Sequence, residues 1–302
     1  MRIFLSRFRF VSLALDLFLN IARLYGEEAL AVFRSSHVAV VGLGGVGSWA
    51  AEALARSGVG KLTLIDLDEV CLSNINRQLH ALTTTVGQSK VAVMAERLRS
   101  INPEVNLSSR DDFLSQKNID ALITRDVDVV IDAVDSAAVK AGLVAWASRH
   151  KKRLIVTGSS GGKIDATRIR VTDLGLTEQD PLLAKVRNIL YRHFGFAKPG
   201  QSSRGRSFDQ KPDKQQSGKK CTRRHAARRF RIDAVSSPEA RRFVQADGSV
   251  CGVKDGSIDS ANGRLDCAGS LGSSMMVTAS FGLLASQRAL ERIQQDKTGK
   301  TG

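Results

Sequence analysis

The architecture of this chain follows from residues 37–56, which read HVAVVGLGGVGSWAAEALAR. The mostly apolar residues 37–41 predict a buried strand, and the alanine-rich residues 48–56 predict a helix. Between them, glycine allows backbone to approach a phosphate closely, and the following helix offers N–H groups and the positive end of its dipole. The stretch therefore predicts a nucleotide-binding loop with four glycines: Gly42, Gly44, Gly45 and Gly47.

Strand and helix patterns alternate along much of the remaining chain. Further strands are expected at residues 62–65, 105–107, 127–131 and 154–157, and further helices at residues 88–100 and 137–149. Later residues predict an antiparallel strand at 167–172, an amphipathic helix at 181–194 and a long final helix at 273–293. This order predicts an α/β fold with a doubly wound, mostly parallel, Rossmann-like sheet and a C-terminal extension.

Composition divides the chain into four segments. We expect an atypical N-terminal segment at residues 1–20, a nucleotide-binding α/β domain at 21–197, a basic insertion at 198–231, and the rest of the same domain at 232–302. Residues 204–242 hold 13 Lys or Arg against 4 Asp or Glu, so they supply 9 of the 15 net positive charges. The insertion is either a flexible arm that binds the phosphate backbone of a nucleic acid or a disordered loop without that role.

Cysteine content and the N-terminus bear on location. The 302 residues include 4 cysteines, none in a CxxC pair, which disfavours a zinc ribbon and fits a reducing cytoplasmic compartment. Cys71 is expected to be a packing residue rather than a reactive one. The apolar run at residues 10–19 is too short to span a bilayer. Residues 1–20 could be an organelle-targeting segment, a membrane-surface helix or a misassigned start.

Charged residues after the second strand indicate which nucleotide binds. Asp66 lies 19 positions after Gly47, where a carboxylate is expected to hold ribose hydroxyls. The glycine loop and Asp66 alone would fit an NAD-dependent oxidoreductase equally well. Arg77 and Lys90 favour ATP, because a triphosphate needs cationic partners when its α-phosphate is attacked.

Two aspartates follow the strand expected at residues 127–131. Open α/β sheets bind ligands beyond the carboxyl ends of their strands, which places Asp135 to hold Mg²⁺ against the triphosphate. Asp132 could share that role or cap the following turn.

The motifs GLGGVGS, IDLDEVCLSNINRQ, GQSK and VIDAVDS together resemble the ubiquitin-activating-enzyme-like adenylation fold, which molybdopterin and thiamine biosynthesis enzymes share. Further stretches narrow the resemblance to the family of tRNA threonylcarbamoyladenosine dehydratases: ARLYG at 22–26, RQLHAL at 77–82, INPE at 101–104, GGKID at 161–165, QDPL at 179–182 and DCAGS at 266–270. The chain departs from the family pattern at residues 16–20 and 204–229.

The resemblance implies ATP-dependent cyclisation of the threonylcarbamoyl group on an adenosine beside the tRNA anticodon. An acyl adenylate would form, and AMP and pyrophosphate would be released. The family pattern implies a nucleotide site that includes Asp66, Asp68, Asn74, Arg77 and Lys90, with Asp135 on Mg²⁺. It also implies a homodimer, with Arg23 as the nearest candidate for an arginine that reaches an active site.

The sequence also leaves open a bound cation, a protein partner and three alternative functions. Residues 266–271 could offer carbonyl oxygens to a monovalent cation, and a partner from a sulfurtransferase system fits the superfamily. Alternative functions are adenylation of the C-terminus of a sulfur-carrier or ubiquitin-like protein, NAD-dependent oxidoreduction, and a non-catalytic scaffold.

Overall fold

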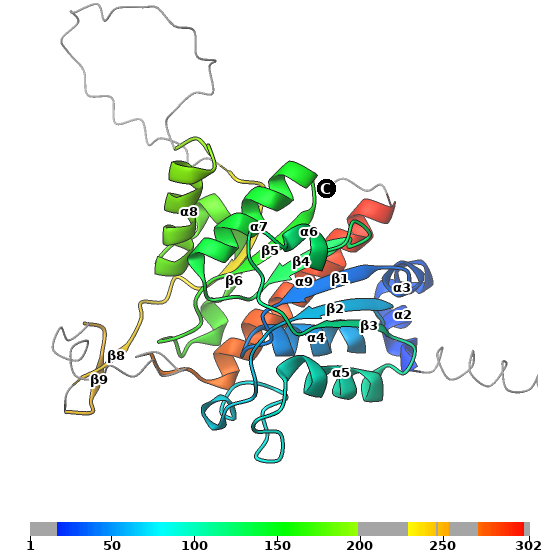
Figure 1. The fold of residues 1–302 in the computed structure, drawn as a ribbon, viewed down its shortest axis with the longest axis horizontal. Helices are drawn as coiled ribbons and strands as arrows, with labels where there is room; N and C mark the ends of the chain where they lie inside the picture. The colour runs from blue at the N-terminus through cyan, green and yellow to red at the C-terminus, as the bar shows by residue number, and fades with distance from the viewer. Residues whose placement is uncertain (1–16, 199–228, 246, 254–270, 299–302) are drawn as a thin grey trace, which may run out of the picture.

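The computed structural model describes residues 17–198, 229–245, 247–253 and 271–298. Most of the segment predicted at residues 1–20, nearly all of the basic insertion at 198–231, and residues 266–270 lie outside these ranges. The described residues form a central sheet between two layers of helices (Figure 1). Among them, no helix has both the length and the apolar character needed to cross a membrane.

The central sheet has seven strands in the order β3-β2-β1-β4-β5-β7-β6. Their bounds are β1 (His37–Val41), β2 (Lys61–Ile65), β3 (Asn106–Arg110), β4 (Val129–Asp132), β5 (Arg153–Thr157), β6 (Arg170–Asp173) and β7 (Asp233–Ser236). Only β6 runs antiparallel to its neighbour. The predicted doubly wound, mostly parallel fold is therefore confirmed.

Two apolar clusters bury the faces of the sheet. One joins β1 and β2 to α3 (Glu27–Arg34), α4 (Gly47–Arg56), α5 (Lys90–Ile101) and α9 (Met275–Thr298), and the other joins β4 and β5 to α6 (Ile119–Leu122), α7 (Ala137–His150) and α8 (Pro181–His193). The buried residues of α4 are mostly alanines, and these small side chains let α9 pack closely along α4. The long final helix is thus part of the core rather than an appendage.

Short elements complete the described chain. They are α2 (Leu19–Tyr25), the 3-10 turns η1 (Leu72–Asn74), η2 (Ala166–Arg168) and η3 (Leu174–Leu176), and a separate hairpin of β8 (Phe243–Val244) and β9 (Val250–Cys251).

Several predicted boundaries were wrong. The strand expected at residues 167–172 begins as η2, because the Asp165 side chain accepts the N–H of Thr167 and closes a turn. The strand expected at 105–107 runs from Asn106 to Arg110, and its polar residues are tolerated because it pairs only with β2 at the sheet edge. Strand β7 was not predicted, and it inserts between β5 and β6.

Candidate functional site

Loops from the carboxyl ends of three adjacent strands meet at one edge of the sheet. The glycine loop follows β1, Asp66 follows β2, and residues 133–135 follow β4. The strand order reverses between β1 and β4, and sheets of this kind bind ligands in the crevice at that point. The two loops there touch, since a Cβ on Gly42 would lie 3.0 Å from the carbonyl carbon of Ala133. The candidate site lies at this crevice.

The four predicted glycines differ in what requires them. Gly42 has a φ of 85°, in the left-handed region, and a Cβ on Gly47 would overlap the carbonyl oxygen of Gly42. A Cβ on Gly45 would lie 3.3 Å from Cγ of Arg77. A Cβ on Gly44, by contrast, would meet no atom within 4 Å. Turn geometry and packing therefore require Gly42 and Gly47, while Gly44 presents open backbone just before α4, where a phosphate can approach.

The Asp66 carboxylate braces this loop. Its Oδ2 accepts the N–H of Leu43 at 2.5 Å, and its Oδ1 accepts the N–H of Asp68 at 2.9 Å. Burial raises the pKa of Asp66, and the positive charge of Lys90 opposes that rise. Each carboxylate oxygen can accept more than one hydrogen bond, so Asp66 retains capacity for a ribose hydroxyl.

Lys90 is a buried cation at the first position of α5. Its side chain is 7% exposed, and its Nζ donates to Oδ2 of Asp68 at 2.7 Å, whereas the Asp68 side chain is 73% exposed. An ammonium group is costly to bury unless an anion or hydrogen bonds compensate it. Asp68 provides that compensation, and a phosphate oxygen has the charge to do the same.

Hydrogen bonds to several segments fix the position of Arg77. Its Nη1 donates to the backbone oxygen of Ser73 at 2.6 Å and to Oδ1 of Asn76 at 3.0 Å. Its own backbone oxygen accepts the indole N–H of Trp49, on α4, at 3.0 Å. The Asn76 amide in turn donates to the backbone oxygen of Ser273 at 2.8 Å, just before α9. These contacts fix the segment that carries the guanidinium.

Asn74 stabilises the segment that carries Arg77. Its side chain is buried, and its Oδ1 accepts the N–H of Cys71 at 3.1 Å, which closes η1. Its backbone oxygen accepts the N–H of Arg77 at 3.1 Å. These contacts position Arg77, and a contact between Asn74 and the nucleotide stays a prediction.

The two aspartates after β4 have different environments. Asp132 is fully buried with Lys140, whose Nζ lies 2.8 Å from its Oδ1, and the same oxygen accepts the N–H of Val134 at 3.1 Å. The predicted turn-capping role of Asp132 is therefore confirmed. Asp135 is exposed, and within the described residues its carboxylate has no hydrogen-bond or ion-pair partner.

Arg23 does not join this site within the same chain. It is exposed on α2, which packs beside α3 at the end of the sheet where β1 begins (Figure 1). The loop lies at the other end of α4, whose ten residues span about 15 Å. Within one chain, Arg23 therefore lies too far from the crevice to contact a nucleotide there.

His80 is a buried residue near the site to which the sequence analysis assigned no role. It is 2% exposed, and neither ring nitrogen has a hydrogen-bond partner among the described residues. Burial lowers its pKa to about 4, assisted by the positive charges of Lys90 and Arg97. A neutral ring therefore lies near the buried ammonium. The sequence signal was a histidine between apolar neighbours 10 positions before Lys90.

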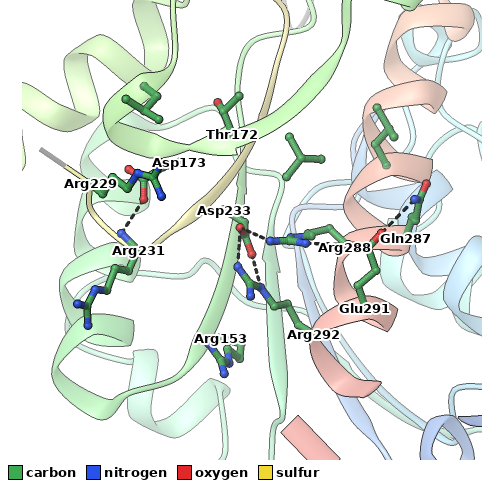
Figure 2. Close-up of a pocket in the computed structure, with 13 residues that line it drawn as sticks. Arg153, Thr172, Asp173, Arg229, Arg231, Asp233, Gln287, Arg288, Glu291 and Arg292 are labelled. Carbon is green, nitrogen blue, oxygen red and sulfur yellow. Dashed lines mark hydrogen bonds and ion pairs between the residues drawn. The ribbon is translucent and has the colours of Figure 1, made fainter. Parts of the chain in front are cut away.

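An arginine-rich cavity of about 760 Å³ lies elsewhere, between β6, β7 and α9 (Figure 2). Arg288 and Arg292 both point to Asp233 and donate to its carboxylate at 2.7–3.0 Å. Burial would raise the pKa of Asp233, but these hydrogen bonds hold it below its usual range. None of the predicted site residues lines this cavity. In the described part of the chain, no three His, Cys, Asp or Glu side chains form a group able to hold a metal ion.

Comparisons with known proteins find relatives over almost the whole chain. The ThiF family matches residues 18–301. The tRNA threonylcarbamoyladenosine dehydratase of Escherichia coli is 45% identical over 274 residues, covering 90% of this chain and 91% of the relative. The enzyme of the same name from Haemophilus influenzae is 41% identical over 279 residues, covering 92% and 94%.

A solved structure matches over nearly the whole chain. It is the E. coli tRNA N6-threonylcarbamoyladenosine dehydratase in complex with ATP, with a TM-score of 0.75 and 40% identity, covering 95% of this chain and 97% of that one.

Proposed function

The chain belongs to the ThiF family, and from this membership we propose that it is an ATP-dependent dehydratase that cyclises threonylcarbamoyladenosine beside the anticodon of tRNA. The observation that carries this proposal is a combination at one crevice. The crevice combines open backbone at Gly44, the buried ammonium of Lys90 and the hydrogen-bonded guanidinium of Arg77. The chain also aligns over nine-tenths of its length with a dehydratase.

ATP fits the residues at this crevice. The open face of Gly44 before α4 suits a phosphate group, and Asp66 suits the ribose hydroxyls. Asp68, which already pairs with Lys90, lies at the rim of the same site. When ATP binds, Lys90 leaves Asp68 and pairs with the triphosphate, so an ion pair with phosphate replaces the ion pair with Asp68.

The reaction proceeds in two steps that remove one water. A carboxylate oxygen of the threonyl group attacks the α-phosphorus, the bond to the β-phosphate breaks, and pyrophosphate leaves. The carbamoyl group then attacks the acyl carbon and releases one N–H proton to solvent, and the bond from that carbon to the AMP oxygen breaks, so AMP leaves with the former carboxylate oxygen. Negative charge on the phosphates increases in the transition state of the first step, and Arg77 and Lys90 neutralise that charge.

Asp135 is the residue that would hold Mg²⁺ in this site. Mg²⁺ at nucleotide sites commonly takes one or two carboxylates together with substrate phosphates and water, so a cage of protein ligands is not required. The Asp135 carboxylate, which has no partner among the residues that the structure describes, suits that donor set, while Asp132 is neutralised by Lys140. The bound ion supplies positive charge against the triphosphate.

Assembly and location complete the proposal. A homodimer would bring Arg23 of a second copy to the crevice, and the cytoplasm is the expected compartment, where tRNA is available. A monovalent cation at residues 266–271 and a sulfurtransferase-system partner remain predictions. Among these residues, only Leu271 is described.

A turnover assay tests the proposed function. We expect the purified chain to convert ATP to AMP and pyrophosphate only when tRNA bearing threonylcarbamoyladenosine is present. Adenylation of a sulfur-carrier protein would instead release pyrophosphate with that protein and without tRNA. Tight binding of NAD without ATP turnover would support the oxidoreductase alternative.

A further inference from the structure

A second cavity, of about 810 Å³, lies beyond the carboxyl ends of β5 and β7. It is bounded by the segment after β5, by the segment after β7 and by strand β9 of the β8–β9 hairpin, which lies at the end of the molecule away from α2 and α3 (Figure 1). Three arginines line it: Arg168, Arg241 and Arg242. We call this cavity the arginine pocket.

The arginine pocket holds two acidic side chains, Asp165 and Glu239, against its three arginines. The Glu239 carboxylate accepts the backbone N–H groups of Ile164 and Asp165 at 3.0–3.2 Å. The Asp165 carboxylate accepts the N–H and the hydroxyl of Thr167. Both carboxylates thus bind neutral donors rather than guanidinium groups, and three arginines against two carboxylates leave the lining with one net positive charge.

Within the described residues, the charge of Asp165 acts on Arg168, but no carboxylate lies within ion-pair distance of the three guanidinium groups. None forms an ion pair there, and Nε of Arg241 is buried without a hydrogen-bond partner. Lys163 lies fully buried beside Ser237, and its Nζ donates to that backbone oxygen at 2.8 Å. Burial lowers the pKa of Lys163, and the charge of Arg241 lowers it further against the attraction of Asp180. Positive charge is therefore concentrated here, and an anion would relieve it.

The cavity in Figure 2 differs, because three of the five arginines that line it form ion pairs, although Arg229 and Arg231 form none among the described residues. There Arg288 and Arg292 share Asp233, and Arg153 pairs with Asp296 across the exposed end of α9. The presence of arginines is therefore not what distinguishes the arginine pocket. The distinction is that none of its three guanidinium groups forms an ion pair among the described residues, whereas Arg153, Arg288 and Arg292 all do.

Hydrogen bonds connect the arginine pocket to the candidate site. The N–H of Arg242 donates to Gly162 at 2.8 Å, and the N–H of Gly162 donates to Gly272 at 2.7 Å. The next residue, Ser273, accepts the side-chain amide of Asn76. Asn76 precedes Arg77, so a short series of contacts links the pocket to the predicted phosphate-binding arginine at the same end of the sheet.

We propose that the arginine pocket binds backbone phosphates of the tRNA substrate while its modified nucleoside occupies the crevice. This inference rests on the proposed function. Guanidinium groups bind phosphate oxygens through paired N–H donors, and phosphodiesters flank any nucleoside that enters the site. The pocket would orient the anticodon loop without reading bases.

The test measures tRNA binding as a function of salt. The variant Arg168→Ala/Arg242→Ala changes two exposed side chains, so folding should be retained. Arg241→Lys keeps the charge of a half-buried side chain but loses the planar fork. Binding of threonylcarbamoylated tRNA, measured by fluorescence anisotropy without ATP, should weaken about tenfold in the double variant. The slope of log affinity against log salt should become shallower by about 0.7–0.9 for each phosphate that the variant no longer neutralises. Arg153→Ala, which removes one exposed ion pair at the other end of the sheet, is the control and should leave the slope unchanged.

Two further measurements separate the possible failures. ATP affinity should be the same in the wild type and the double variant. An unchanged salt slope in that variant would overturn the inference. So would a double variant that no longer bound free pyrophosphate but still bound tRNA as tightly as the wild type. If the wild type bound tRNA through these arginines but removed no water from its nucleoside, the proposed function would fail instead.

Discussion

Gly44→Ala should abolish most nucleotide binding while leaving the fold intact. A Cβ at this position meets no atom within 4 Å, and Gly44 does not have a positive φ, so alanine fits without strain. Such substitutions stabilise a protein by about 0.4–1 kcal/mol, because the unfolded chain loses conformational freedom. The new methyl group would point into the space where we place a phosphate.

The magnitude for ATP follows from the hydrogen bonds that the methyl group would displace. A hydrogen bond between a backbone N–H and a charged phosphate contributes about 1.5–3 kcal/mol. Loss of one such bond weakens ATP binding about 10- to 100-fold.

Gly47→Ala is the matched control, because its Cβ would overlap the carbonyl oxygen of Gly42. The backbone must move to admit it, at a cost of about 1–3 kcal/mol.

Isothermal titration with ATP and thermal unfolding of both variants distinguish the two effects. We expect Gly44→Ala to lose affinity at an unchanged or raised Tm, and Gly47→Ala to lower the Tm. Wild-type ATP affinity in Gly44→Ala would refute the placement of the nucleotide on the glycine loop, whatever happened to Gly47→Ala.

Three further predictions concern single side chains. Lys140→Met should destabilise the fold by about 3–5 kcal/mol in denaturant titrations, because it leaves the buried Asp132 carboxylate unpaired, and adding Asp132→Asn should restore at least half of that loss. Asp135→Asn should lower pyrophosphate release at least 100-fold with tRNA binding unchanged, and near-normal turnover would remove its proposed role on Mg²⁺. The pKa of His80 is lowered to about 4, so the unfolded state binds its proton first as the pH falls below about 6.5, and stability decreases through that window. Wild type should therefore lose about 2 kcal/mol more than His80→Gln between pH 7 and pH 5, and parallel losses would contradict a buried neutral ring.

Local sequence was enough to place the glycine loop and its flanking elements. Residues 37–56 combine a strand, a turn and a helix in one continuous stretch, so their pattern needs no distant partner. The different demands on Gly44 and Gly47 could have been foreseen only in part. A Cβ at Gly42 would crowd Ala133, which is brought beside it by pairing of β1 with β4.

Features that depend on distant segments were beyond sequence reasoning. Strand β7 has only four residues and follows a long polar segment, so nothing local marks its insertion beside β5. The link between Asn76 and Ser273 spans 197 positions. Lys140 carried a usable signal, since a lysine within an otherwise apolar helix indicates a buried partner, and Asp132 lies 8 positions earlier.

Nucleoside mass analysis of the tRNA product is the most direct test of the proposed dehydration. Threonylcarbamoylated tRNA would be incubated with the purified chain, ATP and Mg²⁺, then digested to nucleosides. We expect the threonylcarbamoyladenosine mass to fall by one water, only when ATP is present. An unchanged nucleoside mass from a chain that still binds ATP would contradict the proposed reaction.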